Sequence, residues 1–283
     1  MTRMSFAVVL SGLAITAVSA NAGTVYLDDN MGQLWAGDPT TATYSYVGTS
    51  STAAGFGGFT DIDFVGNILY GLSRAGELYT IDPTTAQITS DVGSTGVSDG
   101  SLVGLAGDSS GNLWAGGNNS VYTLNLGSGA ATPVGGGGGY VTEGDLDFDG
   151  SGNLWLTSTS PAGGALYQIN TGNGAGTLVG QLKDGLGNSY TDVFGVAYDS
   201  DNGVLYGYDV SGNQFDINTA SPNNSGLGEA LFAETGGGAQ DIGGILGAAY
   251  IASPEPSTFA SAAIGSALIL FALYRRRRTN RTV

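Results

Sequence analysis

The chain has 283 residues, 50 of them glycine, and a formal charge of −16 at pH 7. It contains no cysteine and no histidine, which excludes disulfides, cysteine-based zinc sites, thiol nucleophiles and every histidine-dependent catalytic triad. Between positions 23 and 252 only Arg74 and Lys183 oppose 23 acidic residues, a formal charge of −21 that repels nucleic acid.

Residues 1–22 have the pattern of a secretory signal peptide. Arg3 gives the positive start, and an apolar stretch follows from Phe6 to Val18. Ala20 and Ala22 form an A-x-A site for signal peptidase, so we expect export and a mature chain that begins at Gly23. An uncleaved membrane anchor is the alternative for this segment.

The body, residues 23–252, consists of repeated short strands separated by glycine-rich turns. One apolar-aromatic strand begins near positions 68, 113, 154 and 204, which are 45, 41 and 50 residues apart. Another strand precedes each of them, beginning at Asp61, Gly104, Asp145 and Gly195, and we call it the first strand of its repeat. A third strand follows, as in Leu78-Tyr-Thr-Ile and Leu166-Tyr-Gln-Ile. Four strands in each 40–50 residues are typical of a β-propeller blade.

The two ends of the body each supply part of one blade. The strand that starts at Val25 has no first strand before it, and Gly247–Ile251 is a first strand with nothing after it. We therefore predict an all-β, five-bladed propeller that is closed by pairing of its N- and C-terminal strands. A β-sandwich and a β-solenoid are the alternative folds.

Two of the five first strands carry acidic pairs where the others have glycine or alanine. Each pair has the spacing i, i+2, which places both carboxylates on one face of the strand. Near the crowded axis such groups must be hydrated, paired or bound to a metal such as Ca²⁺. The candidate metal ligands are Asp61, Asp63, Asp145, Asp147 and Asp149.

Asp149 belongs to a second pattern as well. The run from Asp145 to Gly150 reads D-x-D-x-D-G, the first half of an EF-hand loop, but Leu156 occupies the position that needs a glutamate. Related Asp/Gly/Asn clusters recur in other repeats, so a hairpin turn is the competing interpretation of this segment.

Residues 253–283 form a separate tail. Pro254-Glu255-Pro256-Ser257 precede an uncharged stretch from Phe259 to Tyr274, which predicts a short membrane helix. A cluster of arginines follows directly and should stay on the cytoplasmic side: Arg275, Arg276, Arg277 and Arg278.

This tail resembles the PEP-CTERM sorting domain. The resemblance covers residues 253–281 and implies recognition by an exosortase, a membrane protease-transpeptidase of Gram-negative bacteria that make exopolysaccharide. It also implies an inner-membrane intermediate, followed by release to the cell surface or extracellular matrix. An ordinary tail anchor is the alternative.

The sequence thus predicts an exported, non-enzymatic binding or structural module of the extracellular matrix. An extracellular polysaccharide or a matrix protein is the expected partner. The alternative function is a glycan hydrolase that uses paired carboxylates on the propeller, as retaining and inverting glycosidases do.

Overall fold

A computed structural model describes residues 23–50, 58–97, 101–117, 119–136, 138–142, 144–160, 164–233 and 242–253. The predicted signal peptide, residues 1–22, and residues 254–283 of the predicted sorting tail, with its predicted membrane helix, lie outside the described residues. Within these ranges the single helix is the 3-10 helix η1 (Pro222–Asn224), and no helix there is long and apolar enough to cross a membrane.

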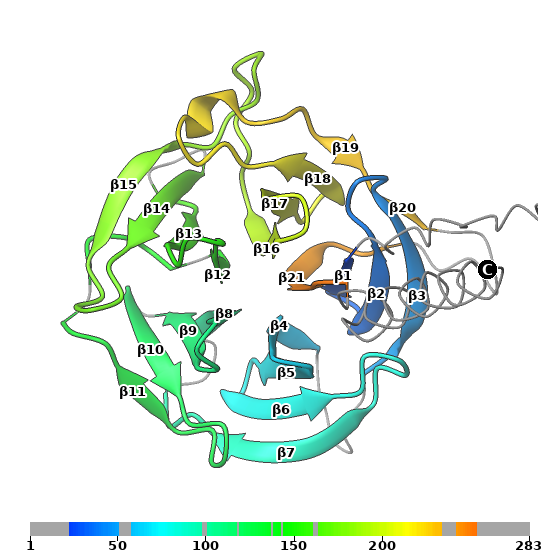
Figure 1. Cartoon of the computed structure of the whole chain (residues 1–283), viewed down its shortest axis with the longest axis vertical. Helices are drawn as coiled ribbons and strands as arrows, with labels where there is room; N and C mark the ends of the chain where they lie inside the picture. Colours follow the sequence, from blue (N-terminus) through cyan, green and yellow to red (C-terminus); the bar gives the residue numbers. More distant parts are fainter. Residues whose placement is uncertain are drawn as a thin grey trace, which may run out of the picture. The chain divides into compact units, whose positions relative to one another are not determined.

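The strands form five sheets that surround a common axis, so the body is a five-bladed β-propeller (Figure 1). Blades 2 to 5 are four-stranded antiparallel meanders whose first strands lie innermost.

Blade 2 contains β4 (Phe59–Val65), β5 (Ile68–Ser73), β6 (Glu77–Ile81) and β7 (Ile88–Ser94). Blade 3 contains β8 (Leu102–Gly107), β9 (Leu113–Gly117), β10 (Ser120–Leu124) and β11 (Ala131–Pro133). Blade 4 contains β12 (Leu146–Phe148), β13 (Leu154–Ser158), β14 (Ala165–Ile169) and β15 (Gly176–Gln181). Blade 5 contains β16 (Val193–Asp199), β17 (Val204–Asp209), β18 (Asn213–Asp216) and β19 (Glu229–Ala230).

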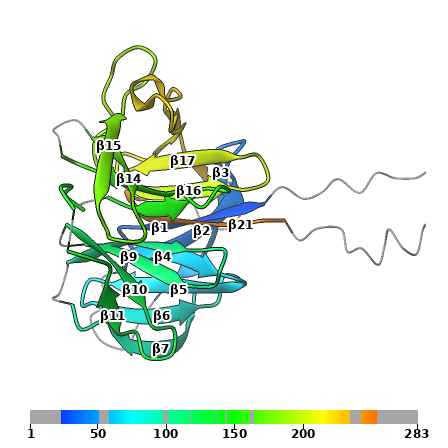
Figure 2. The same ribbon diagram turned by 60° about the vertical axis from the view of Figure 1, so that its left-hand side comes forward.

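Blade 1 is built from both ends of the body, which confirms the predicted closure. Its inner strand is β21 (Ile245–Ile251), and β1 (Thr24–Asp29), β2 (Gln33–Asp38) and β3 (Thr43–Thr49) follow outward. β1 and β21 lie side by side and are antiparallel, with Val25 opposite Tyr250 (Figure 2). A short parallel strand, β20 (Phe232–Ala233), adds to the outer edge of β3. Pairing with β21 covers the edge of β1, which would be exposed if the C-terminal strand did not close the blade.

Aspartate-centred turns connect many of the strands. Asp108 accepts hydrogen bonds from the amides of Ser110 and Asn112 and from the side chains of Asn112 and Trp114. All three tryptophans of the chain donate their indole N–H to an aspartate six residues earlier: Trp35 to Asp29, Trp114 to Asp108 and Trp155 to Asp149. The side chain therefore satisfies the turn amides and also orients the large aromatic ring of the next strand.

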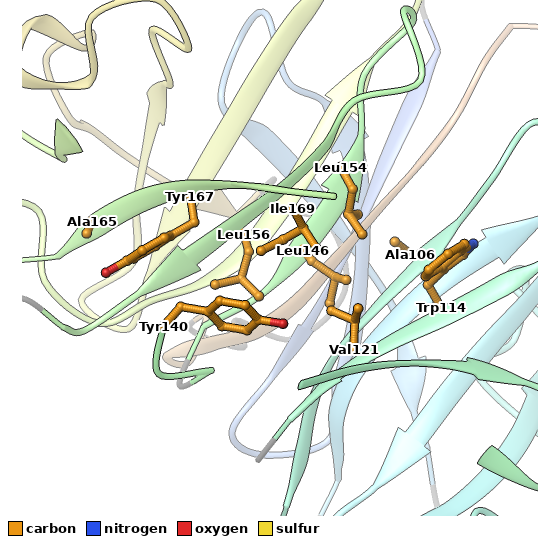
Figure 3. Packing of buried hydrophobic residues seen from close by; sticks show 10 residues of the cluster. All are labelled: Ala106, Trp114, Val121, Tyr140, Leu146, Leu154, Leu156, Ala165, Tyr167 and Ile169. Carbon is orange, nitrogen blue, oxygen red and sulfur yellow. The ribbon is translucent and has the colours of Figure 1, made fainter. Parts of the chain in front are cut away.

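The hydrophobic core is divided among the five seams between neighbouring blades. Between blades 3 and 4, Trp114 and Val121 pack against Leu146, Leu156 and other buried residues of blade 4 (Figure 3). The seam between blades 5 and 1 is equivalent and joins the two ends of the body. Because residues 23–253 contain every seam and form a compact unit, this body carries its own core.

Candidate functional site

The four predicted axis carboxyls lie at the centre of the ring. Asp61 and Asp63 are on β4, Asp147 is on β12 and Asp145 directly precedes it. Their exposed fractions are 0%, 6%, 9% and 0%, respectively. The glycines and alanines predicted for the other inner strands leave room for them, because a side chain at Gly247 would clash with Asp61. The structure thus brings these four residues together as buried side chains near the axis.

Each acidic pair binds the backbone of the next blade. Asp61 and Asp63 accept hydrogen bonds from the amides of Leu105 and Gly107 on β8. In the same way, Asp145 accepts one from Val196 and Asp147 one from Tyr198 on β16, both at 2.6 Å. Inner strands have a free edge whose buried N–H groups need acceptors. The acidic pairs therefore link β4 to β8 and β12 to β16.

The axis carboxyls hold protons more tightly than ordinary aspartates. Burial, with the facing Asp145, raises the pKa of Asp61 well above its usual range, and the two carboxyls share a hydrogen bond. That bond requires a proton on one partner, since two carboxylates in contact repel each other. Burial also raises the pKa of Asp63 and brings that of Asp147 to about 7. These groups are suited to linking strands, and a carboxylate hydrolase would need a different, exposed acidic pair.

Asp149, the fifth candidate ligand, does not join the axis group. It lies in the β12–β13 turn, where Ser151, Asn153 and Trp155 donate to its two oxygens at 2.8–3.0 Å. In the described part of the chain no three acidic side chains converge so that they could hold a metal ion. The turn accounts for the Asp/Gly/Asn pattern, and calcium binding at these residues stays an untested alternative.

The connection between the third and fourth strands of blade 5 is longer than the equivalent connections of blades 2 to 4. The strand pattern of the sequence did not reveal this difference. In blades 2, 3 and 4 the link between the third and fourth strands has six residues: 82–87, 125–130 and 170–175. In blade 5 the equivalent link runs from residue 217 to 228, which is twelve residues; it includes η1, and its first residue, Ile217, is buried in the seam between blades 4 and 5. We call residues 218–228 the blade-5 loop. Extra residues in one repeat often build the binding face of a repeat protein.

The blade-5 loop is held in place by the connection between blades 4 and 5. Lys183 donates its amide to the carbonyl of Pro222 at 3.0 Å, and Ser225 donates to the carbonyl of Lys183 at 2.9 Å. The Tyr190 hydroxyl donates to the carbonyl of Gly226 at 2.6 Å, while its ring stacks on Phe215 with centroids 3.6 Å apart. The loop is therefore ordered before any ligand arrives, which lowers the entropic cost of binding.

A pocket lies on each side of this loop. The inner pocket, of about 450 Å³, is lined by Asp149, Tyr198, Leu205, Asp216, Asn218 and Asn224, among others. The outer pocket, of about 510 Å³, is lined by Gly180, Lys183, Ser221, Pro222 and others. Both volumes fall in the range of about 300–1,000 Å³ that is common for small-molecule sites. The two pockets and the loop between them are the candidate functional site.

A signal for this loop is present in the sequence spacing. The first strands begin at matched positions 61, 104, 145, 195 and 247, so the intervals are 43, 41, 50 and 52 residues. The two long intervals contain the connection 183–190 and the blade-5 loop. A comparison of interval lengths, rather than of strand motifs, would have placed the insertion.

The fold is similar to that of several solved structures at low sequence identity. A crystal structure of a nidogen–laminin complex includes a chain with a TM-score of 0.55 and 13% identity, covering 82% of this chain and 99% of that one. A protein of unknown function from Bacteroides caccae has a TM-score of 0.45 and 12% identity, covering 74% and 73%. The extracellular domain of a putative hybrid two-component system from B. thetaiotaomicron has a TM-score of 0.40 and 14% identity, covering 74% and 28%.

No family model matches the sequence, and no curated protein matches it significantly. Identities this low show the fold alone, and a propeller fold hosts many functions. The architecture is compatible with an extracellular binding module.

Proposed function

We propose that this protein is an exported, non-enzymatic binding module of the extracellular matrix and that the blade-5 loop forms its ligand site. The observation that supports this most is the loop itself, which breaks the repeat in one blade and has a preformed pocket on each side. The conspicuous acidic residues of the axis are buried in links between strands, so they do not provide an exposed reactive pair.

Delivery to the outside forms the second part of the proposal. The signal peptide directs export, signal peptidase cleaves after Ala22, and an exosortase recognises Pro254-Glu255-Pro256 together with the arginine cluster. Replacing the three motif residues by alanine should leave export intact but trap the protein at the inner membrane. An altered protein that still reached the surface or medium would contradict the sorting role, whatever the outcome of ligand binding.

A loop exchange tests the ligand site. Residues 218–228 are replaced by Asn-Thr-Gly-Asn-Gly-Ala, the matching link 170–175 of blade 4, in a body that spans residues 23–253. The exchange keeps Ile217, which is buried in the seam between blades 4 and 5. The measurement is retention of each protein on extracellular matrix isolated from the producing cells.

The native body should be retained on the matrix and the loop-exchanged body should not, and both should melt cooperatively. The matched control replaces residues 125–130 of blade 3 by the same six residues, and this protein should still be retained. Equal retention of the native and loop-exchanged bodies would contradict the proposed site. Release of soluble sugar from the matrix by the native body would instead indicate a hydrolase.

A further inference from the structure

The inner pocket has a chemistry that selects among ligands. It lies between the β12–β13 turn of blade 4 and the β16–β17 turn and blade-5 loop of blade 5. Among the residues that the structure describes, its lining includes Asp149 and Asp216 but no lysine or arginine. With a body charge of −21 around it, this pocket disfavours anions such as uronates, sulfates and phosphates.

The polar groups of the lining are not equally available. Asp149 already accepts four hydrogen bonds in its turn. The Asn218 side chain accepts from the amides of Ala220 and Ser221 and so supports the loop. By contrast, the carboxylate of Asp216 is exposed and has no hydrogen-bond partner in the part of the chain that the structure describes. Asp216 is therefore the acceptor that remains for a ligand.

The surroundings of Asp216 disfavour its charged form, which a cation bound beside it would stabilise. Although Asp216 is exposed by surface area, the atoms packed around it partly desolvate its carboxylate, and this effect, with the nearby Glu229, raises its pKa above the usual value. A positively charged group would offset both effects, because it stabilises the carboxylate and relieves the repulsion between the two acids. Charge-assisted hydrogen bonds of this kind are stronger than neutral ones.

Tyr198 contributes an aromatic side chain to the lining of the same pocket. Its phenol reaches the turns of both blades, since the hydroxyl lies against Gly150 and near Gly203. The backbone of Tyr198 is fixed by Asp147 of the axis, which accepts its amide at 2.6 Å. A ring held in this way can contact the apolar face of a sugar or an ammonium group.

We propose that the inner pocket binds an amine-bearing saccharide unit, with its ammonium on Asp216 and its ring against Tyr198. This proposal rests on the proposed function and names its ligand class. Ser151, Thr219 and Asn224 also line the pocket, and residues of these polar types can pair with the hydroxyls of a sugar. A lysine side chain could form an ion pair with Asp216 but would leave these polar groups without partners.

Two trisaccharides that differ only in the amine give the sharpest test. Calorimetric titration of the body 23–253 uses glucosamine trisaccharide and its fully N-acetylated form at pH 7 and low salt. The first should bind, with an affinity that falls as NaCl is raised, and the second should bind at least about tenfold more weakly. Asp216→Asn should remove this preference, whereas Asp91→Asn, an exposed acid on β7, should leave it unchanged.

Several results would overturn the proposal. Equal binding of both trisaccharides would show that the acid does not select the amine, and tighter binding of tri-lysine would favour a basic protein partner. Absence of binding by every probe would overturn the ligand class.

The loop exchange on isolated matrix separates these outcomes from failure of the proposed function, because matrix retention does not depend on which sugar was chosen. Melting curves show whether Asp216→Asn is folded, and the salt dependence of the native body gives a second readout.

Discussion

Gly23 donates its amide to the carboxylate of Asp201 at 3.1 Å, which ties the first described residue to the β16–β17 turn of blade 5. The same oxygen accepts a hydrogen bond from the amide of Ser253 at 3.2 Å. One side chain of the fifth blade therefore holds both ends of the body, directly beside the paired strands β1 and β21.

Asp201→Ala should weaken the closure of the ring. Two charge-assisted hydrogen bonds are lost, but the site is exposed, so the expected cost is about 1 kcal/mol, or about 2–4 °C in melting temperature. Asp91→Ala on β7 removes an exposed acid of another blade and should melt like the parent. Equal melting of both variants and the parent would show that Asp201 does not hold the ends.

Gly129→Ala should be strongly destabilising. Gly129 has a φ of 76°, and an added Cβ would clash with the carbonyl of Gly93 in the neighbouring blade. Gly152→Ala is the matched control, since its φ is 80° and its Cβ would meet no atom within 4 Å. The control should cost about 1–2 kcal/mol from the left-handed backbone alone. A thermal melt in which both variants lose the same stability would contradict close packing of blades 2 and 3 at this turn.

The axis carboxyls should make the protein more stable in mild acid than in base. Their raised pKa values mean that the folded ring binds more protons than the unfolded chain above about pH 4, the ordinary range of aspartate. Unfolding free energy therefore falls as the pH rises, for Asp147 up to about pH 7.

The measurement is the melting temperature at pH 5 and pH 8 at constant ionic strength. The parent should melt lower at pH 8, and Asp147→Asn should show a smaller difference. Asp108→Asn is the control, because hydrogen bonds to Asn112 and Trp114 lower the pKa of Asp108 despite its partial burial, and its titration lies below this interval. A difference in Asp147→Asn as large as in the parent would refute the assignment.

Calcium at 1–5 mM should not raise the melting temperature of the body by more than about 1 °C. Asp61, Asp63, Asp145 and Asp147 already accept backbone hydrogen bonds, and Asp149 is occupied by its turn. A ligand that binds only the folded state stabilises it by mass action. An increase of several degrees, abolished by Asp61→Asn, would instead establish the calcium site that the sequence pattern suggested.

Much of the fold could be predicted because each blade repeats its own local signals. Aromatic strands such as the one at Trp155 and turns such as that of Asp149 recur at similar spacing. The closure of the ring could also be predicted, because the body begins with a second strand at Val25 and ends with a first strand at Gly247, and together these strands belong to one blade. These are properties of strand order, which sequence spacing records directly.

The roles of the acidic residues could not be predicted in the same way. Strand alternation placed Asp61 and Asp63 on one face, but their partners are amides of β8, 44 residues away. That pairing depends on the relative height of two blades around the axis. The inner pocket likewise depends on how turns of two blades and the blade-5 loop bring Tyr198 and Asp216 into one lining. Neither relationship leaves a local motif in the chain.

Hydrogen exchange of the body 23–253, with and without isolated extracellular matrix, tests the central claim most directly. It requires no choice of ligand and reports which amides become protected on binding. We predict that matrix slows exchange in residues 218–228 and in the adjoining turn 199–203, while the matched link 82–87 of blade 2 is unchanged. Protection confined to another blade or to the opposite face, with residues 218–228 unaffected, would contradict a binding module built on the blade-5 loop.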